Sequence, residues 1–385
     1  MDHLETSTEI LRHLIAFPTV STDSNLAMIN YLADRLEQVG AHVTRYHDAT
    51  GGKANLYATL GPERAGGILL AGHTDVVPVT DQNWSSDPFS LKAQNGRLYG
   101  RGTCDMKGFI AACIALAPEF ARLATRRPIH FAFTYDEETG CLGAADLALH
   151  LAKREDRPSL AIIGEPTRMA LIEGHKGCCE YSTHFSGREG HGSQPELGVN
   201  AVEYAVCYIT RLMELRGDLQ ARAPVNSAFN PPYSTINVGA LHGGIAHNVI
   251  PGLATVDWET RPVQMGDLAH VKTTMQNYCD DVLLPRMQSV WADANIVTDT
   301  IGETVGLEPM AENEARDLVM ELTGANGTDV VSFGTEAGIF QSLGMAALVC
   351  GPGSIKQAHK PDEYIEISQL QDCLNMLERL GTRLS

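Results

Sequence analysis

The chain has 385 residues, of which 44% are hydrophobic and 20% are charged, a composition that is ordinary for a globular protein. This length predicts about two to three domains, and no apolar run reaches the ~18 residues that a membrane-spanning helix needs. The formal net charge of −18 argues against binding to nucleic acid or to anionic membranes, because those partners attract basic surfaces.

Helices and strands alternate through the first part of the chain. Apolar residues recur at helical spacing in two early segments, and strand-like apolar runs follow them. We expect helices at 4–16 and 25–39 and strands at 41–46, 55–59, 68–72, 128–134 and 160–163. Such alternation, which continues to about Ile172, is typical of an α/β fold with a mostly parallel sheet.

The pattern changes after Lys176. There we expect strands at 179–185, 235–240 and 254–259 and helices at 199–215 and 266–284. This order is typical of an antiparallel sheet with helices on one face. A later strand at 346–350 is as apolar as the earlier ones and belongs with the first sheet. The sequence therefore predicts a discontinuous domain, 1–178 plus 289–385, and an inserted α+β domain, 179–288.

Side chains with metal-binding chemistry lie where the expected strands end. They are His73 and Asp75 after 68–72, Glu137 and Glu138 after 128–134, Glu165 after 160–163, His359 after 346–350, and Asp105 before a helix at 109–122. Ligand-bearing loops in open α/β sheets cluster outside the carboxyl ends of strands. A lone histidine or a pair of adjacent acids is usually a surface feature, but coincidence does not explain the whole set. The sequence predicts a metal site.

Five short motifs carry a family resemblance along nearly the whole chain. They are His73-Thr-Asp75, Gly100-Arg-Gly102 with Asp105-Met-Lys-Gly108, Glu137-Glu138, Gly164-Glu165-Pro166, and His359. Their order resembles that of the di-zinc aminoacylase/carboxypeptidase G/succinyl-diaminopimelate desuccinylase peptidase family. Two further segments, 332–338 and 351–364, resemble the branch of this family that acts on N2-acetyl-L-ornithine.

The resemblance implies two divalent metal ions, Zn²⁺ or Co²⁺. It implies that Asp105 bridges the ions, and that His73 with Glu165 and Glu138 with His359 complete the ligand set. Nitrogen and oxygen ligands without thiolate are consistent with catalytic zinc, or with cobalt in its place.

Two acids beside these ligands have other implied roles. The family assigns Glu137 as the general base, and adjacent side chains diverge, so Glu137 and Glu138 do not easily ligate together. Asp75 fits the carboxylate that orients a ligating imidazole, with a turn-forming aspartate as the alternative.

The resemblance also suggests residues that contact the substrate. His191 would stabilise the oxyanion, often from the partner subunit, and Asn248 and Arg261 would hold a substrate carboxylate. Glu336 would face the cationic end of an ornithine side chain. The alternatives are a loop histidine for His191, exposed polar residues for Asn248 and Arg261, and a helix-start acid for Glu336.

The expected activity is metal-dependent hydrolysis of an N-acyl amino acid, with N2-acetyl-L-ornithine favoured and arginine biosynthesis the implied pathway. Succinyl-diaminopimelate, another N-acyl amino acid or a dipeptide is the alternative substrate, and a catalytically inactive binding protein is the alternative class. We expect a homodimer formed through the inserted domain, which would serve for dimerisation or as a lid. We also expect a cytoplasmic location, because the first residues lack a signal-peptide pattern.

Overall fold

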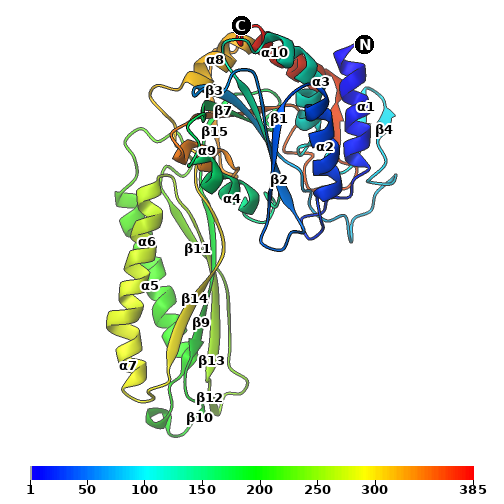
Figure 1. Ribbon diagram of the computed structural model, residues 1–385. Helices are drawn as coiled ribbons and strands as arrows, with labels where there is room; N and C mark the ends of the chain where they lie inside the picture. The colour runs from blue at the N-terminus through cyan, green and yellow to red at the C-terminus, as the bar shows by residue number, and fades with distance from the viewer. Residues whose placement is uncertain (1) are drawn as a thin grey trace. The chain divides into compact units, whose positions relative to one another are not determined.

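The computed structural model describes residues 2–385, which divide into two compact units (Figure 1). Unit 1 comprises the chain up to Gly174 together with Pro309–Val330 and Thr335–Ser385. Unit 2 comprises His175–Glu308 and Val331–Gly334. Within residues 2–385, no helix is both long and apolar enough to cross a membrane.

Unit 1 is built on an eight-stranded sheet. Its strands, in spatial order, are β1 (His42–His47), β2 (Ala54–Leu60), β6 (Ile129–Thr134), β3 (Gly67–His73), β7 (Pro158–Pro166), β16 (Ala346–Gly351), β8 (Ile172–His175) and β15 (Asp329–Val331). The central strands β6, β3, β7 and β16 are parallel, whereas β1 pairs antiparallel with β2, β2 with β6, and β8 with β16. All seven residues of β3 are buried, as expected for a strand covered on both faces. The predicted α/β fold with a large, mostly parallel sheet is confirmed.

Helices cover this sheet on both faces (Figure 1). They are α1 (His3–Ile15), α2 (Leu26–Gln38), α3 (Lys107–Leu123), α4 (Leu142–Leu151), α8 (Glu314–Thr323), α9 (Ala337–Ser342) and α10 (Ile367–Gly381). A small sheet of β17 (Tyr364–Glu366), β5 (Arg97–Tyr99) and β4 (Lys92–Gln94) lies beside them. Helix α3 packs against α1, α10 and the sheet, because its sequence is apolar nearly all round.

Unit 2 contains a four-stranded antiparallel sheet in the order β11 (Thr235–Gly243), β13 (Leu253–Arg261), β9 (Cys178–Ser186) and β14 (Asn295–Thr304). A two-stranded ladder joins β10 (Gly190–His191) to β12 (Val249–Ile250). The helices of this unit are α5 (Ala201–Ala221), α6 (Met265–Tyr278) and α7 (Leu284–Gln288), with a short 3₁₀ helix at Pro195–Leu197 and a π-helical segment, Cys279–Leu283, between α6 and α7. Burial alternates along β9, whose inward face packs with α5 and α6.

The second unit extends further than the expected insert of 179–288. Strand β14 pairs with β9 from Asn295↔Ser186 to Thr304↔Cys178, so the unit continues to Glu308. Most of the side chains of β14 are exposed, and its polar sequence lacks the apolar alternation that marks a half-buried strand. For that reason the sequence pattern did not predict a strand at 295–304.

A buried histidine on β6 predicts a pH-dependent stability of unit 1. Burial lowers the pKa of His130 to about 4, and its Nδ1 lies 2.8 Å from the Tyr57 hydroxyl and 2.9 Å from Thr59 Oγ1. The unfolded chain, with an imidazole pKa of about 6.5, therefore binds more protons as the pH falls, and stability is lost below that value. Between about pH 7 and pH 5, the wild type should lose about 2 kcal/mol more unfolding free energy than His130→Gln.

Urea unfolding curves at the two pH values measure this difference. His175, also buried with its pKa lowered to about 4, is present in both proteins, so its own pH-dependent contribution cancels in the comparison. An identical loss of stability in the wild type and in His130→Gln would contradict the prediction.

Candidate metal centre

The carboxyl edge of the parallel strands of unit 1 brings the predicted ligands together. His73 is the last residue of β3, Glu138 follows β6 after a short turn, and Glu165 is the penultimate residue of β7. Because β6, β3 and β7 are parallel neighbours, these side chains lie at one edge of the sheet. Asp105 lies two residues before the start of α3, and His359 lies in the loop between β16 and β17.

Close packing of β7 against α3 adds Asp105 to this edge. The ring of Phe109 lies directly over Gly164, where an added Cβ would be 2.0 Å from Phe109 Cγ. A side chain larger than hydrogen at Gly164 would push the start of α3 away from β7. Glycine before Glu165 therefore lets the helix bearing Asp105 approach the strand.

The two carboxylate oxygens of Asp105 face different histidines. His73 Nε2 lies 3.0 Å from Asp105 Oδ1 and 3.8 Å from Glu165 Oε1. His359 Nε2 lies 3.4 Å from Asp105 Oδ2 and 3.0 Å from Glu138 Oε2. The structure thus brings all five predicted ligands together, in two clusters that share Asp105.

The electrostatics of these clusters fit divalent cations. Burial, with the nearby Asp105 charge next in size, raises the pKa of Glu165 well above its usual value and raises that of Glu138. Burial alone would raise the pKa of Asp105 as well, but the hydrogen bonds from His359 and His73 lower it overall. In addition, Glu165 Oε1 is buried without a hydrogen-bond partner. Several acids that repel one another in a dry site are stabilised when cations lie between them.

The tautomer of His73 also suits a ligand. Its Nδ1 lies 2.9 Å from the main-chain carbonyl oxygen of Asp75, which only accepts hydrogen bonds. The neutral ring therefore carries its proton on Nδ1, and the lone pair of Nε2 points toward Asp105 and Glu165.

The carboxylate of Asp75 is close enough to His73 for an ion pair, but its hydrogen bonds are made to other groups. Its nearer oxygen is 3.6 Å from His73 Nδ1, beyond a hydrogen bond. Instead it accepts the main-chain N–H groups of Glu137 at 3.1 Å and Glu138 at 3.3 Å, and the hydroxyl of Ser21 at 2.7 Å. Asp75 therefore anchors the turn that carries the two glutamates, while its carbonyl orients the imidazole.

Glu137 lies within this cluster. One of its carboxylate oxygens, a nitrogen of His73 and an oxygen of Glu165 are all within 4.8 Å of one another. Burial raises the pKa of Glu137 well above its usual value. A raised pKa favours uptake of a proton by this carboxylate.

Glu336 is also close to this edge but has no exposed surface. Its Oε2 accepts the hydroxyl of Thr134 at 2.7 Å, and burial raises its pKa to about 7. In this structure Glu336 therefore presents no surface on which the cationic end of a substrate would bind.

Two buried charged residues were not singled out from the sequence. Arg101 and Glu363 form an ion pair of 2.7 Å, and each side chain is 1% exposed. Each lies four residues along the chain from a predicted ligand, Asp105 or His359. Both residues lie close to a predicted ligand in the sequence, and this position was the signal that could have identified them. Charged residues are rarely buried without a partner, so each predicts the other.

The other predicted site residues belong to unit 2, where His191 and Asn248 are neighbours. Pairing of β10 with β12 places His191 opposite Val249, and the N–H of Gly192 donates to the carbonyl of Asn248 at 2.8 Å. The Nδ1 of the exposed His191 ring lies 2.8 Å from Ser193 Oγ and accepts the N–H of Ser193 at 3.2 Å. The neutral ring therefore carries its proton on Nε2, which is free to act as a donor.

Arg261 lies at the other end of unit 2. It is the last residue of β13, whose nine residues span roughly 26 Å from Leu253. The chain enters and leaves this unit, at His175 and Glu308, at the Arg261 end. The guanidinium of Arg261 binds one oxygen of Glu259 at 3.1 and 2.9 Å. Within one chain the structure does not bring Arg261 together with His191 and Asn248.

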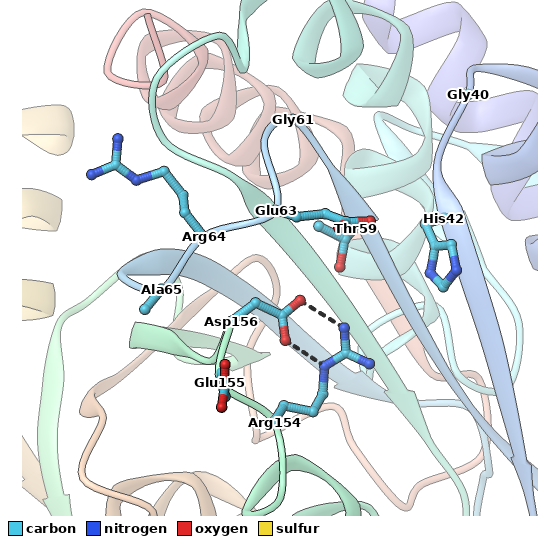
Figure 2. Close-up of a pocket in the computed structure, with 10 residues that line it drawn as sticks. All are labelled: Gly40, His42, Thr59, Gly61, Glu63, Arg64, Ala65, Arg154, Glu155 and Asp156. Atoms are coloured by element: carbon cyan, nitrogen blue, oxygen red, sulfur yellow. Dashed lines mark hydrogen bonds and ion pairs between the residues drawn. The ribbon is translucent and has the colours of Figure 1, made fainter.

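A pocket of about 590 Å³ on unit 1 lies away from the metal centre (Figure 2). Its lining includes Gly61 and residues 63–65, which precede β3, and Arg154–Asp156, which precede β7. It is therefore at the opposite edge of the sheet from the end of β3. Its charges are mixed, and Asp156 engages Arg154 through two hydrogen bonds of 2.9 and 2.7 Å.

The chain is similar to known proteins in sequence and in fold. A model of the family described as peptidase family M20/M25/M40 matches residues 69–383. An acetylornithine deacetylase from Shigella sonnei strain Ss046 is 38% identical over 365 residues, which cover 93% of this chain and 92% of that protein. Among solved structures, a tripeptidase from Staphylococcus aureus has a TM-score of 0.72 at 18% identity, covering 99% of this chain and 98% of the other. An M20 family metallo-carboxypeptidase from Sulfolobus solfataricus has a TM-score of 0.72 at 17% identity, covering 98% and 99%.

Proposed function

The chain belongs to peptidase family M20/M25/M40, and from this premise we propose that it is a metal-dependent hydrolase of N2-acetyl-L-ornithine, releasing acetate and L-ornithine. One observation carries the choice of substrate. The relative named acetylornithine deacetylase is 38% identical over 93% of this chain, whereas the structural neighbours named as peptidases are below 20% identical and share the fold. The reaction would serve arginine biosynthesis in the cytoplasm.

His73, Glu165 and Asp105 would hold one metal ion, and Glu138, His359 and Asp105 the other. Two Zn²⁺ or Co²⁺ ions supply Lewis-acid chemistry that polarises an amide carbonyl and acidifies water. Two clusters on either side of Asp105 support this ligand set. Their buried acids have raised pKa values, so nearby positive charge would stabilise the ionised carboxylates.

Glu137 would accept the proton of the attacking water and deliver it to the leaving amine nitrogen. The burial of its carboxylate beside His73 and Glu165 supports this role. Asp75 would hold Glu137 in place through the main-chain N–H groups of the turn. The base would thus be fixed by hydrogen bonds that do not depend on its own side chain.

His191 would donate from Nε2 to the oxyanion, and Asn248 and Arg261 would bind the substrate carboxylate. Because His191 and Asn248 are at the opposite end of unit 2 from Arg261, we propose that they act in the site of a second subunit of a homodimer. The net charge of −18 is compatible with a substrate that carries a positive side chain.

Steady-state kinetics on a panel of N-acyl amino acids test the proposal. We expect the highest kcat/KM for N2-acetyl-L-ornithine, a lower value for N-acetyl amino acids with uncharged side chains, and slow turnover of succinyl-diaminopimelate and dipeptides. Efficient turnover of succinyl-diaminopimelate without turnover of acetylornithine would overturn the substrate. A chain that binds metal but hydrolyses nothing on the panel would favour an inactive binding protein.

A further inference from the structure

A buried carboxylate, Glu363, ties together the two loops that bear Asp105 and His359. Its Oε1 accepts the main-chain N–H groups of Cys104 at 2.9 Å and Asp105 at 3.1 Å. Its Oε2 accepts the N–H of Gly102 at 3.0 Å and Nη1 of Arg101 at 2.7 Å. Both oxygens are therefore saturated by donors, and all of these donors belong to residues 101–105.

Arg101 extends this connection to the backbone of residues 359 and 360. Its Nη1 donates to the carbonyl of Lys360 at 3.3 Å, and its Nη2 donates to Gln82 Oε1 at 2.6 Å. The amide of Gln82 in turn donates to the carbonyl of His359 at 3.0 Å. Gln82 thus holds the main-chain carbonyl of His359, and Arg101 holds that of Lys360.

The two ligands on these loops need such support. His73 and Glu165 lie on strands of the sheet, whereas Asp105 and His359 lie outside it. The side chain of His359 is 53% exposed, and its backbone has φ 62°, a left-handed conformation that is uncommon for a residue with a Cβ. Surrounding hydrogen bonds must hold that conformation.

We propose that Glu363 and Arg101 are positioning residues that set the spacing between Asp105 and His359. They would thereby set the affinity for the metal ion held by Glu138, His359 and Asp105, called the second ion below. The inference rests on the proposed metal-dependent function. Charge-assisted hydrogen bonds from a guanidinium and three amides make a strong anchor in a buried site. Hydrogen-bond partners that orient metal ligands typically change metal affinity by about 10- to 100-fold when altered.

The decisive variant is Glu363→Gln, which keeps the size of the side chain but turns one acceptor into a donor. That amide group would face N–H donors, so two of the four bonds would be lost. Equilibrium dialysis of the full chain against Co²⁺ buffered by a chelator should show the smaller change for the ion held with His73 and Glu165, because two of its ligands lie on strands of the sheet. The second ion should bind about 10- to 100-fold more weakly.

Two matched variants make this result specific. Glu138→Ala removes a proposed ligand and marks the complete loss of the second ion. Asp267→Asn removes another buried carboxylate, 1% exposed and paired with Arg222 at 3.0 Å, but in unit 2. We expect its melting temperature to fall while both Co²⁺ affinities stay at wild-type values.

The outcomes distinguish a failure of this inference from a failure of the metal centre on which it rests. A folded Glu363→Gln chain that binds both ions as tightly as the wild type overturns the inference alone. A wild type that binds no second ion overturns the metal centre and the inference together. If Glu363→Gln does not fold, the half-buried Gln82→Ala decides, because it removes the bond to the His359 carbonyl without stranding a buried charge pair. We expect a severalfold weaker second ion, and unchanged affinity in Gln82→Ala overturns the inference.

Discussion

Replacing Glu137 with glutamine should lower kcat by about 10²- to 10⁴-fold, the typical contribution of general acid–base catalysis. The amide has nearly the size of the carboxylate but does not accept a proton from water. The turn should stay in place, because Asp75 holds the main-chain N–H groups of Glu137 and Glu138 rather than the side chain that is changed. Metal content and KM should therefore remain near those of the wild type.

Steady-state kinetics with atomic emission measurement of bound metal test this expectation. Asp136→Asn is the matched control, since it changes an acid to its amide in the same turn, where the carboxylate binds Lys53 at 2.5 and 2.7 Å instead of facing the metal centre. Its kcat should fall much less. Near-normal turnover by Glu137→Gln would assign the proton transfer to another group.

The sequence was sufficient for the parts of this site that follow from a repeated pattern. Strands such as β3 and β7 are continuous apolar runs, and each ends in a side chain able to bind metal. Because parallel neighbours end at the same edge, the spatial cluster of His73, Glu138 and Glu165 follows from the order of elements. The polar strand β14, at the edge of the sheet of unit 2, has no such apolar run, so it could not be predicted in this way.

Contacts that depend on the path of loops could not be read from the sequence. The carboxylate of Asp75 is two residues from His73, yet it binds the Glu137–Glu138 turn, 62 residues away. Glu363 and Arg101 are 262 residues apart and meet only because two loops converge. Spacing along the chain identifies ligands that directly follow a strand, but it gives no information on which distant loops those ligands rest against.

His191 makes the second large prediction. If it donates to the oxyanion, His191→Ala should lower kcat by about 10²- to 10³-fold with unchanged metal content, since removing one oxyanion donor typically costs that much. Its Nδ1 already accepts the N–H of Ser193, so Nε2 is the atom that would act. His242→Ala, which alters another exposed histidine of unit 2, is the matched control and should leave kcat near its wild-type value.

A subunit-mixing experiment decides whether His191 acts in the active site of its own chain or in that of its partner. Inactive His191→Ala and inactive Glu137→Gln chains are allowed to exchange, and exchange is verified by native mass spectrometry of tagged subunits. If His191 acts across a dimer, each hybrid has one site with an intact Glu137 and the intact His191 of its partner. At equal amounts, half of the dimers are hybrids with one of two sites restored, so about a quarter of wild-type activity should return. Delivery within one chain leaves every site of every hybrid defective. Because the length of β13 separates His191 from Arg261, we expect recovery. Verified exchange without recovered activity would rule out the cross-subunit role of His191.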